Sequence, residues 1–167
     1  MGEKLTRSDV AKIQEEIDNR KLVIRKQILE EVKEAKAQGD LSENFEYYAA
    51  KQAKNQNESR IAYLENMLKY ATIIEDTAAD DEIGLNKRVK IYYEDDNETE
   101  EYKIVTSIRS DSRRNLISPE GPVGSALMGK HVGDRVEIKM ANGGSYFVKV
   151  LEVVNVGEEE TDTLKRF

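Results

Sequence analysis

Apolar residues in the first part of the chain recur at intervals of three, four or seven positions. They are Val10, Ile13, Ile17, Ile24, Ile28, Val32 and Ala35. This spacing places apolar side chains on one face of an α-helix, and residues 6–38 contain neither Gly nor Pro. The pattern predicts one long helix whose apolar stripe is interrupted at Arg20 and Lys21. At about 1.5 Å per residue this helix is on the order of 45 to 50 Å long, so it must project from a small domain or pair with another helix.

A second helical stripe follows Gly39. Its members alternate at spacings of three and four, as in a coiled coil: Tyr47, Ala50, Lys54, Asn57, Ile61, Leu64, Leu68 and Ala71. Because Gly39 is the one break between two helices of similar length, we predict an antiparallel hairpin with its tip near residues 38–44. A polar seam residue costs stability but can fix the register of two helices. We therefore interpret Lys54 and Asn57 as residues that align the helices.

The pattern changes after Ile74. An acidic stretch is typical of a linker, and short alternating or apolar runs separated by turn sequences then predict strands at 88–93, 101–108, 115–118, 135–140 and 145–154. We expect a short helix at 125–130. The fold class is therefore α+β, with a coiled-coil hairpin and a mainly antiparallel β domain. The predicted boundaries are 1–75 for the hairpin, 76–84 for the linker, 85–156 for the β domain and 157–167 for a flexible acidic tail.

Charge is distributed unevenly between these parts. The formal net charge is −7, which argues against a dedicated duplex-binding protein because such a protein needs a basic face for phosphates. Residues 1–75 carry 13 basic and 14 acidic side chains, whereas residues 76–167 carry 13 and 19. The absence of Cys excludes disulfides and thiolate metal sites. With no apolar leader and no membrane-length apolar run, we expect a cytoplasmic protein.

Two carboxylates near the predicted tip have two interpretations. In the structural one, Gly39 ends the first helix in the αL conformation, and Asp40 with Glu43 forms a capping box that opens the second. In the functional one, the same two carboxylates lie about one helical turn apart at the end of an arm and converge on one cation. Mg²⁺ prefers six oxygen ligands, so the remaining ligands must come from a partner that the arm reaches.

The segment G-D-L-S-E-N-F-E-Y at residues 39–47 closely resembles the G-D-L-S-E-N-A-E-Y signature of the bacterial transcript cleavage factors, the GreA/GreB family. A second motif, G-P-V-G-S-A-L-M-G-K, follows at residues 121–130. Shorter matches lie at residues 49–51, 60–61, 102–105 and 115–118. The chain departs from the family pattern at Phe45, at Pro119 and at Gly121. The resemblance covers most of residues 5–155 and implies an FKBP-like fold for the second half.

The resemblance also implies a function. In this family the coiled coil enters the secondary channel of RNA polymerase and stimulates the Mg²⁺-dependent cleavage of the 3′ end of backtracked RNA by the polymerase. The acids that match Asp40 and Glu43 help to hold a second Mg²⁺ and to position a water, as a two-metal hydrolysis requires. Ser42 and Asn44 are expected to shape the tip or to orient the water. The chain is then an accessory factor, not an enzyme, with no tightly bound cofactor, and we expect a monomer.

Two further contacts follow from the same resemblance. Gly121, Pro122, Val123 and Gly124 are the candidates for binding the polymerase at the channel rim, although a rigid turn before a helix explains the same sequence. The candidates for an RNA-facing basic patch are Lys33, Lys36, Lys51, Lys54 and Arg60. Their alternative interpretation is a solvated helix face with acidic neighbours three or four residues away.

Two other functions stay open. A related regulator could occupy the same channel without promoting cleavage; Phe45, Gly121 and the acidic tail are compatible with it, while the intact Asp40 and Glu43 favour cleavage. A prolyl isomerase or chaperone would need an apolar, aromatic-lined pocket. The second half offers for this only Tyr92, Tyr93, Tyr102, Tyr146 and Phe147, and the chain has no Trp.

Overall fold

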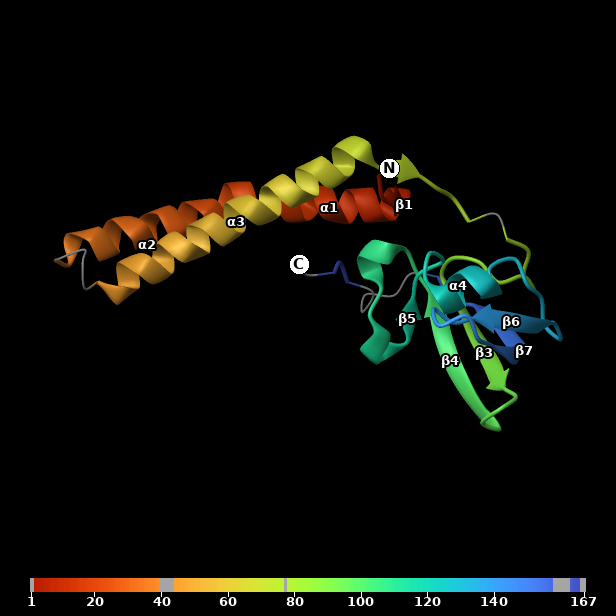
Figure 1. The fold of residues 1–167 in the computed structure, drawn as a ribbon. Helices are drawn as coiled ribbons and strands as arrows, with labels where there is room; N and C mark the ends of the chain where they lie inside the picture. Colours follow the sequence, from red (N-terminus) through yellow and green to blue (C-terminus); the bar gives the residue numbers. More distant parts are fainter. Residues whose placement is uncertain (1, 40–43, 77, 158–162, 166–167) are drawn as a thin grey trace. The chain divides into compact units, whose positions relative to one another are not determined.

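The computed structural model describes residues 2–39, 44–76, 78–157 and 163–165 (Figure 1). The chain separates into two compact units. The first is built mainly from residues 7–72, and the second from residues 73 onward together with residues 4–6. Among the residues that the structure describes, none of the helices combines the length and the apolar character that a membrane span needs.

The first unit is an antiparallel helical hairpin (Figure 1). Its elements are α1 (Arg7–Asn19), the π-helical turn η1 (Arg20–Ile24), α2 (Arg25–Ala37) and the returning helix α3 (Phe45–Tyr70). The predicted hairpin is confirmed, but its first helix is interrupted. Within η1 the N–H of Arg25 donates to the carbonyl of Arg20, one residue further than in an α-helix. The interruption lies where the apolar stripe breaks.

The seam between the helices differs from the predicted one on α3. Ala50, Asn57, Ile61 and Leu64 are buried as expected, and so are Ile13, Ile17, Ile28 and Ala35 on the first arm. Lys54, however, is exposed, whereas Arg60 and Met67 are buried. The seam therefore runs through positions 50, 53, 57, 60, 64 and 67, which is also a three–four alternation. The charged amine of Lys54 stays hydrated at its exposed position. Arg60 can be buried because a carboxylate neutralises the charge of its guanidinium group.

The segments just before α1 and just after α3 pair as a two-stranded sheet of β1 (Lys4–Leu5) and β2 (Thr72–Ile73). The N–H of Thr72 donates to the carbonyl of Glu3 at 2.9 Å, and the N–H of Ile74 donates to that of Leu5 at 2.8 Å. These backbone bonds fix where the returning helix leaves the first unit.

The second unit is a five-stranded sheet with the order β5-β4-β3-β7-β6. The strands are β3 (Lys87–Tyr93), β4 (Glu98–Ile104), β5 (Leu116–Ile117), β6 (Arg135–Lys139) and β7 (Ser145–Asn155). All neighbouring strands are antiparallel except β4 and β5, which are parallel. The predicted class, a helical hairpin followed by a mainly antiparallel β domain, is confirmed.

Three details of the second unit differ from the prediction. The strand expected at 101–108 ends at Ile104, and the 3₁₀ turns η2 (Ser107–Arg109) and η3 (Ser112–Arg114) follow. The short helix α4 spans Pro122–Leu127 instead of 125–130, because Pro122 supplies a first helical residue whose missing N–H is not needed there. Ile83, expected in the linker, is fully buried.

The core of the second unit consists of alternate strand residues that point to one face of the sheet, together with residues from the segment before β3 and from α4. Its buried members are Ile83, Leu85, Val89, Ile91, Ile104, Leu127, Val136, Ile138, Val148 and Val150. Ile83 is held by two backbone bonds, since its N–H donates to Lys130 and its carbonyl accepts from Gly129. The acidic stretch therefore ends inside the domain, and α4 is anchored by Leu127.

The seam predicts how the hairpin responds to truncation of a side chain. Leu64 is fully buried, whereas Leu22 is 74% exposed. We expect Leu64→Ala to lower the free energy of unfolding of the hairpin by about 2 to 5 kcal/mol, because the buried side chain leaves a cavity. The matched control Leu22→Ala should change it by about 0.5 kcal/mol or less. Urea unfolding followed by the helical circular dichroism signal measures both, and equal losses would contradict the assigned seam.

Candidate functional site at the tip of the hairpin

The hairpin reverses direction between α2 and α3. The first arm ends at Ala37, and Gly39 has a φ of 133°. A Gly suits this break because side chains rarely adopt a positive φ, but the value lies outside the αL region, so the predicted αL conformation is wrong. Asp40, Leu41, Ser42 and Glu43 lie outside the described residues, so the predicted metal and water roles of Asp40, Ser42 and Glu43 stay predictions.

Asn44 is the N-cap of α3, which corrects the predicted capping box of Asp40 and Glu43. Its Oδ1 accepts a hydrogen bond from the N–H of Tyr47 at 3.0 Å. Its Nδ2 donates to the carbonyl of Ala35 on the other arm at 2.6 Å. One side chain therefore caps the returning helix and ties it to the last turn of the first arm. The capping position lies one residue after Glu43 because the helix begins at Phe45.

Aromatic side chains surround this cap. Phe45 is 84% exposed, and Tyr48 is also exposed. Tyr47 is half-buried, with its ring centroid 5.7 Å from that of Tyr48 and 5.8 Å from the ammonium nitrogen of Lys36 on the other arm. The Lys36 contact is a second link between the arms at this end, so the tip is held from both sides of the turn.

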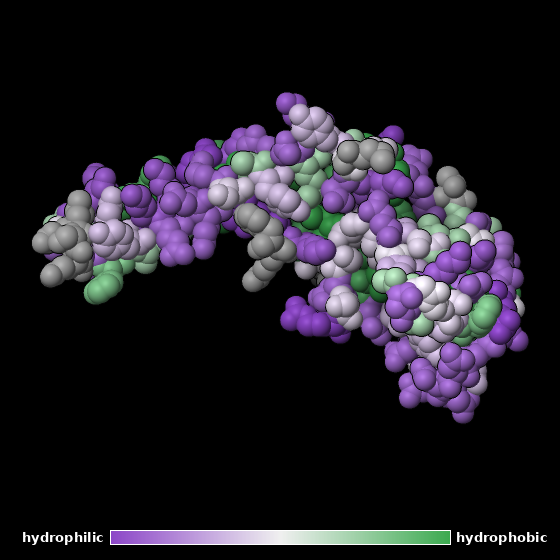
Figure 2. All heavy atoms as spheres, viewed as in Figure 1, coloured by the Kyte–Doolittle hydropathy of each residue, from purple (hydrophilic) through white to green (hydrophobic). Residues whose placement is uncertain are grey.

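The predicted basic patch divides into two groups. Lys33, Lys36, Lys51 and Lys54 are exposed on the hairpin, whose visible surface is largely hydrophilic (Figure 2). Arg60 does not belong with them, because its side chain is 5% exposed and pairs with Glu16. Four of the five candidates can therefore meet a phosphate backbone, while the fifth serves the helix seam.

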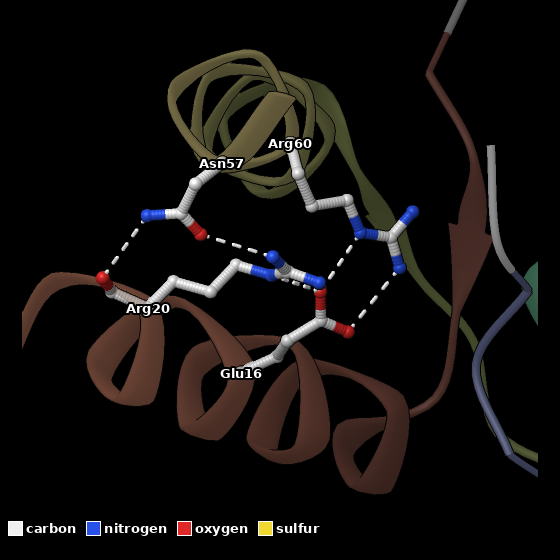
Figure 3. A network of polar contacts seen from close by, with 4 residues as sticks. All are labelled: Glu16, Arg20, Asn57 and Arg60. Carbon is white, nitrogen blue, oxygen red and sulfur yellow. Dashed lines mark hydrogen bonds and ion pairs between the residues drawn. The ribbon is translucent and has the colours of Figure 1, made fainter. Parts of the chain in front are cut away.

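A polar network lies in the seam beside the π-helical turn (Figure 3). The Glu16 carboxylate accepts hydrogen bonds from Arg60, at 2.8 and 3.2 Å, and from Arg20 at 2.8 Å. Arg20 also donates to Oδ1 of Asn57 at 3.0 Å, and Nδ2 of Asn57 donates back to the carbonyl of Arg20 at 3.3 Å. Asn57 therefore contacts the first arm through both ends of its amide, which is how an aligning residue must act.

The same network sets the titration of Glu16. Burial by itself raises the pKa of this carboxyl, but the hydrogen bonds and charges of Arg60 and Arg20 outweigh burial. The pKa therefore lies below its ordinary value of 4.5. The carboxylate is thus the stable form in the folded hairpin. Farther along the seam, Arg25 pairs with Glu58 through two hydrogen bonds of 2.9 and 2.7 Å.

The predicted polymerase contact in the second unit forms the beginning of α4. Gly121 is the N-cap and Pro122 the first residue of the helix, and Pro122 is exposed. Val123 packs partly against the core. Gly124 is buried, and a Cβ at this position would lie only 1.9 Å from the carbonyl oxygen of Ser118. This geometry fits the rigid-turn interpretation and leaves Pro122 free to meet a partner.

Two sequence profiles match the chain. The one described as "Transcription elongation factor, N-terminal" covers residues 3–73, and the one described as "Transcription elongation factor, GreA/GreB, C-term" covers residues 78–155. The chain belongs to the GreA/GreB family. The division between the two profiles lies near the division between the two structural units of this GreA/GreB protein.

Relatives named Transcription elongation factor GreA span nearly the whole GreA/GreB chain. The protein from Thermoanaerobacter pseudethanolicus is 43% identical over 150 residues, which are 89% of this chain and 95% of the relative. The protein from Staphylococcus saprophyticus is 40% identical over 149 residues, which are 89% and 94% of the two chains. The family resemblance inferred from the motifs is confirmed by these matches.

Solved structures of the family are more distant. GreA factor homolog 1 of Thermus thermophilus is 24% identical, covers 92% of this chain and 99% of its own, and has a TM-score of 0.43. A GreA/GreB factor from Nitrosomonas europaea is 28% identical, covers 56% and 78% of the two chains, and has a TM-score of 0.40. The family assignment rests on the sequence profiles and relatives.

Glu16 and Arg60 are the residues of this GreA/GreB hairpin whose role the sequence analysis missed. Arg60 was predicted to face RNA, and Glu16 was not singled out. A usable signal was present, because Arg60 lies three residues after Asn57 and four before Leu64, at a seam position. A charged residue at such a position needs a partner of opposite charge on the facing helix.

The double role of Asn44 is testable by two substitutions. Asn44→Ala removes both the cap and the link to Ala35, and we expect it to lower the free energy of unfolding of the hairpin by about 1 to 2 kcal/mol. Asn44→Ser keeps a capping oxygen but cannot reach Ala35, so its loss should be smaller. Asn55→Ala, at an exposed position of α3, is the control. Urea unfolding measures all three; equal values for Asn44→Ala and Asn55→Ala would refute the assignment.

The lowered pKa of Glu16 predicts that the stability of the hairpin depends on pH. A carboxyl whose pKa is lowered by folding adds stability that is complete above the unfolded pKa near 4.5 and is lost as the pH falls through the lower folded value. We expect Glu16→Gln to be less stable than the unmodified protein at neutral pH, with a difference that shrinks below pH 4.5. Glu15→Gln, on the exposed face of the same helix, is the matched control. Hairpin stability measured by urea unfolding from pH 3 to 7 tests this, and a difference independent of pH would oppose it.

Proposed function

We propose that this chain is a transcription elongation factor that acts on RNA polymerase and stimulates the polymerase's own cleavage of backtracked RNA. The observation that carries the proposal is the place of the Gre signature, residues 39–47, at the turn of a two-helix arm. The family membership and the length of the match with GreA relatives support it. The chain acts as an accessory factor, because its carboxylates work only inside the partner.

The dimensions of the arm suit entry into a channel. The returning helix α3 has 26 residues and is therefore about 39 Å long at about 1.5 Å per residue. The arm is two helices wide, and its exposed lysines lie along the part that leads to the tip. We propose that it enters the secondary channel, with Lys33, Lys36, Lys51 and Lys54 facing the RNA backbone.

The donor chemistry at the tip fits a shared Mg²⁺. Among the residues that the structure describes, no group of three or more His, Cys, Asp or Glu side chains could hold a metal ion. Asp40 and Glu43 would supply one or two carboxylate ligands, and the polymerase and water the others. When bound, Mg²⁺ activates the attacking water and stabilises the leaving oxygen. Asp40 and Glu43 would hold the ion and orient the water for attack on the RNA phosphate.

Asn44 has a different task in this mechanism. Both ends of its amide are engaged, one with the N–H of Tyr47 and the other with the carbonyl of Ala35. It is therefore a positioning residue that fixes where the segment with Asp40 and Glu43 rejoins the arm. The second unit binds the channel rim through Gly121, Pro122, Val123 and Gly124, with the exposed Pro122 at the centre of the contact.

The carboxylate mechanism is tested by the double variant Asp40→Asn with Glu43→Gln. In a halted, backtracked elongation complex we expect this variant to bind RNA polymerase like the unmodified protein but to lose stimulation of cleavage. Glu46→Gln, an exposed residue of the next turn, is the matched control and should keep it. Gel analysis of labelled RNA over a Mg²⁺ series gives the rate. Unaltered cleavage by the double variant would exclude the proposed role.

The same assay separates the alternative function. If the unmodified protein binds the polymerase and competes with a cleavage-active factor but promotes no cleavage at any Mg²⁺ concentration, the chain is a channel-occupying regulator. The exposed Phe45, in place of the family's Ala, is the residue to revert first in that case. Recovery of cleavage by Phe45→Ala would assign the difference to the tip.

A further inference from the structure

A groove lies in the second unit between the 3₁₀ turns and the beginning of α4. Its volume is about 730 Å³. Its walls come from residues 109–114, from β5 and Ser118, from residues 121–124, and from a C-terminal segment, Thr163–Lys165. We call it the docking groove. The residues of its walls are far apart in sequence, so only the folded unit forms it.

The C-terminal segment is attached to this unit by a backbone contact. The N–H of Lys165 donates to the carbonyl of Ile108 in η2. Leu164 is half-buried, and Thr163, Leu164 and Lys165 all line the docking groove. The GreA/GreB profile ends at residue 155, so this segment is additional to the shared domain. It forms a wall that can detach without unfolding the sheet, because no strand or helix includes it.

Another wall of the docking groove is rigid. It includes Gly121, Pro122, Val123 and Gly124, the residues proposed above to bind RNA polymerase. Gly124 packs so closely on Ser118 that a Cβ would lie 1.9 Å from its carbonyl oxygen, and Val123 contacts the core. A partner that approaches α4 from this side therefore meets the C-terminal segment, and the segment is the wall that has to move.

We propose that the C-terminal segment is an intramolecular competitor that covers the polymerase-binding groove in the free protein and is displaced when RNA polymerase binds. This inference rests on the proposed function, because it assumes that residues 121–124 contact the polymerase. The part of the polymerase that takes its place is acidic. Arg113 and Arg114 line the groove at exposed positions, and Asp111, the one acidic residue among the described residues of its walls, pairs with Arg113, whereas Arg109 is buried.

The expected change in affinity for RNA polymerase follows from the fraction of free molecules in which the groove is open. The apparent dissociation constant equals the intrinsic one divided by the fraction of molecules with an open groove. If the segment covers the groove in about 70 to 90% of molecules, its removal tightens binding about 3- to 10-fold. Removal of the segment should change only the affinity for RNA polymerase and not the cleavage step, since the segment is not part of the tip that supports cleavage.

The test compares the full chain, a chain that ends at residue 157, and Leu164→Lys, which places a positive charge at a half-buried position of the arginine-lined groove. Met140→Lys, an equivalent change at a residue that is 43% exposed in the same unit, is the control. Because the chain has no Cys, a single Asn142→Cys variant of each can carry a fluorophore. Anisotropy titration with RNA polymerase gives the dissociation constants. Hydrogen exchange of the Lys165 amide reports directly whether the segment is bound in the groove.

We expect about 3- to 10-fold tighter binding for the shortened chain and for Leu164→Lys, and no change for Met140→Lys. The Lys165 amide should exchange about 3- to 10-fold more slowly in the free full chain than in an unfolded peptide, and that protection should be lost in the complex. Measurable but equal binding of the full and shortened chains, or a Lys165 amide equally protected in both states, would overturn the competitor. Absence of polymerase binding by every variant would instead overturn the proposed function.

Discussion

The burial of Arg60 against Glu16 is the interaction on which the hairpin depends. A charged side chain that is 5% exposed is costly unless a partner of opposite charge and hydrogen bonds compensate it. Glu16 supplies both, and it also holds Arg20, which reaches Asn57 across the seam. Because apolar seam positions tolerate displacement better than this network does, the network selects the alignment of the two helices.

That alignment determines the geometry of the tip. Asn44 can donate to Ala35 only if the end of the first arm and the start of α3 are level, and Lys36 meets Tyr47 under the same condition. The π-helical turn, which begins at Arg20, lies between the buried Ile17 and Ile28 of the same seam. The polar centre of the arm thus positions a turn several helical turns away.

The second unit is organised differently. Its core is apolar and alternates along the strands, so the sheet needs no polar alignment, and the chemistry lies in the connections between strands. The turns after β4 and the beginning of α4 bring residues 109–114 and 121–124 to one groove. One wall of that groove, at Gly124, is rigid, and another, at Thr163–Lys165, can detach. The C-terminal segment can therefore regulate access to the groove.

The sequence by itself determined the two-part fold, the family and the position of the turn. These features are visible in short contiguous stretches of a single sequence: the helical spacing, the single Gly39 break, the alternating strands and the 39–47 signature. Tertiary structure alone decided that Arg60 is buried and Lys54 exposed, that Asn44 ties α3 to Ala35 on the other arm, that Ile83 joins the core, and that residues 163–165 meet Ile108. Each of these depends on a partner distant in sequence, because burial of a charge and the satisfaction of a backbone group are set by what packs opposite.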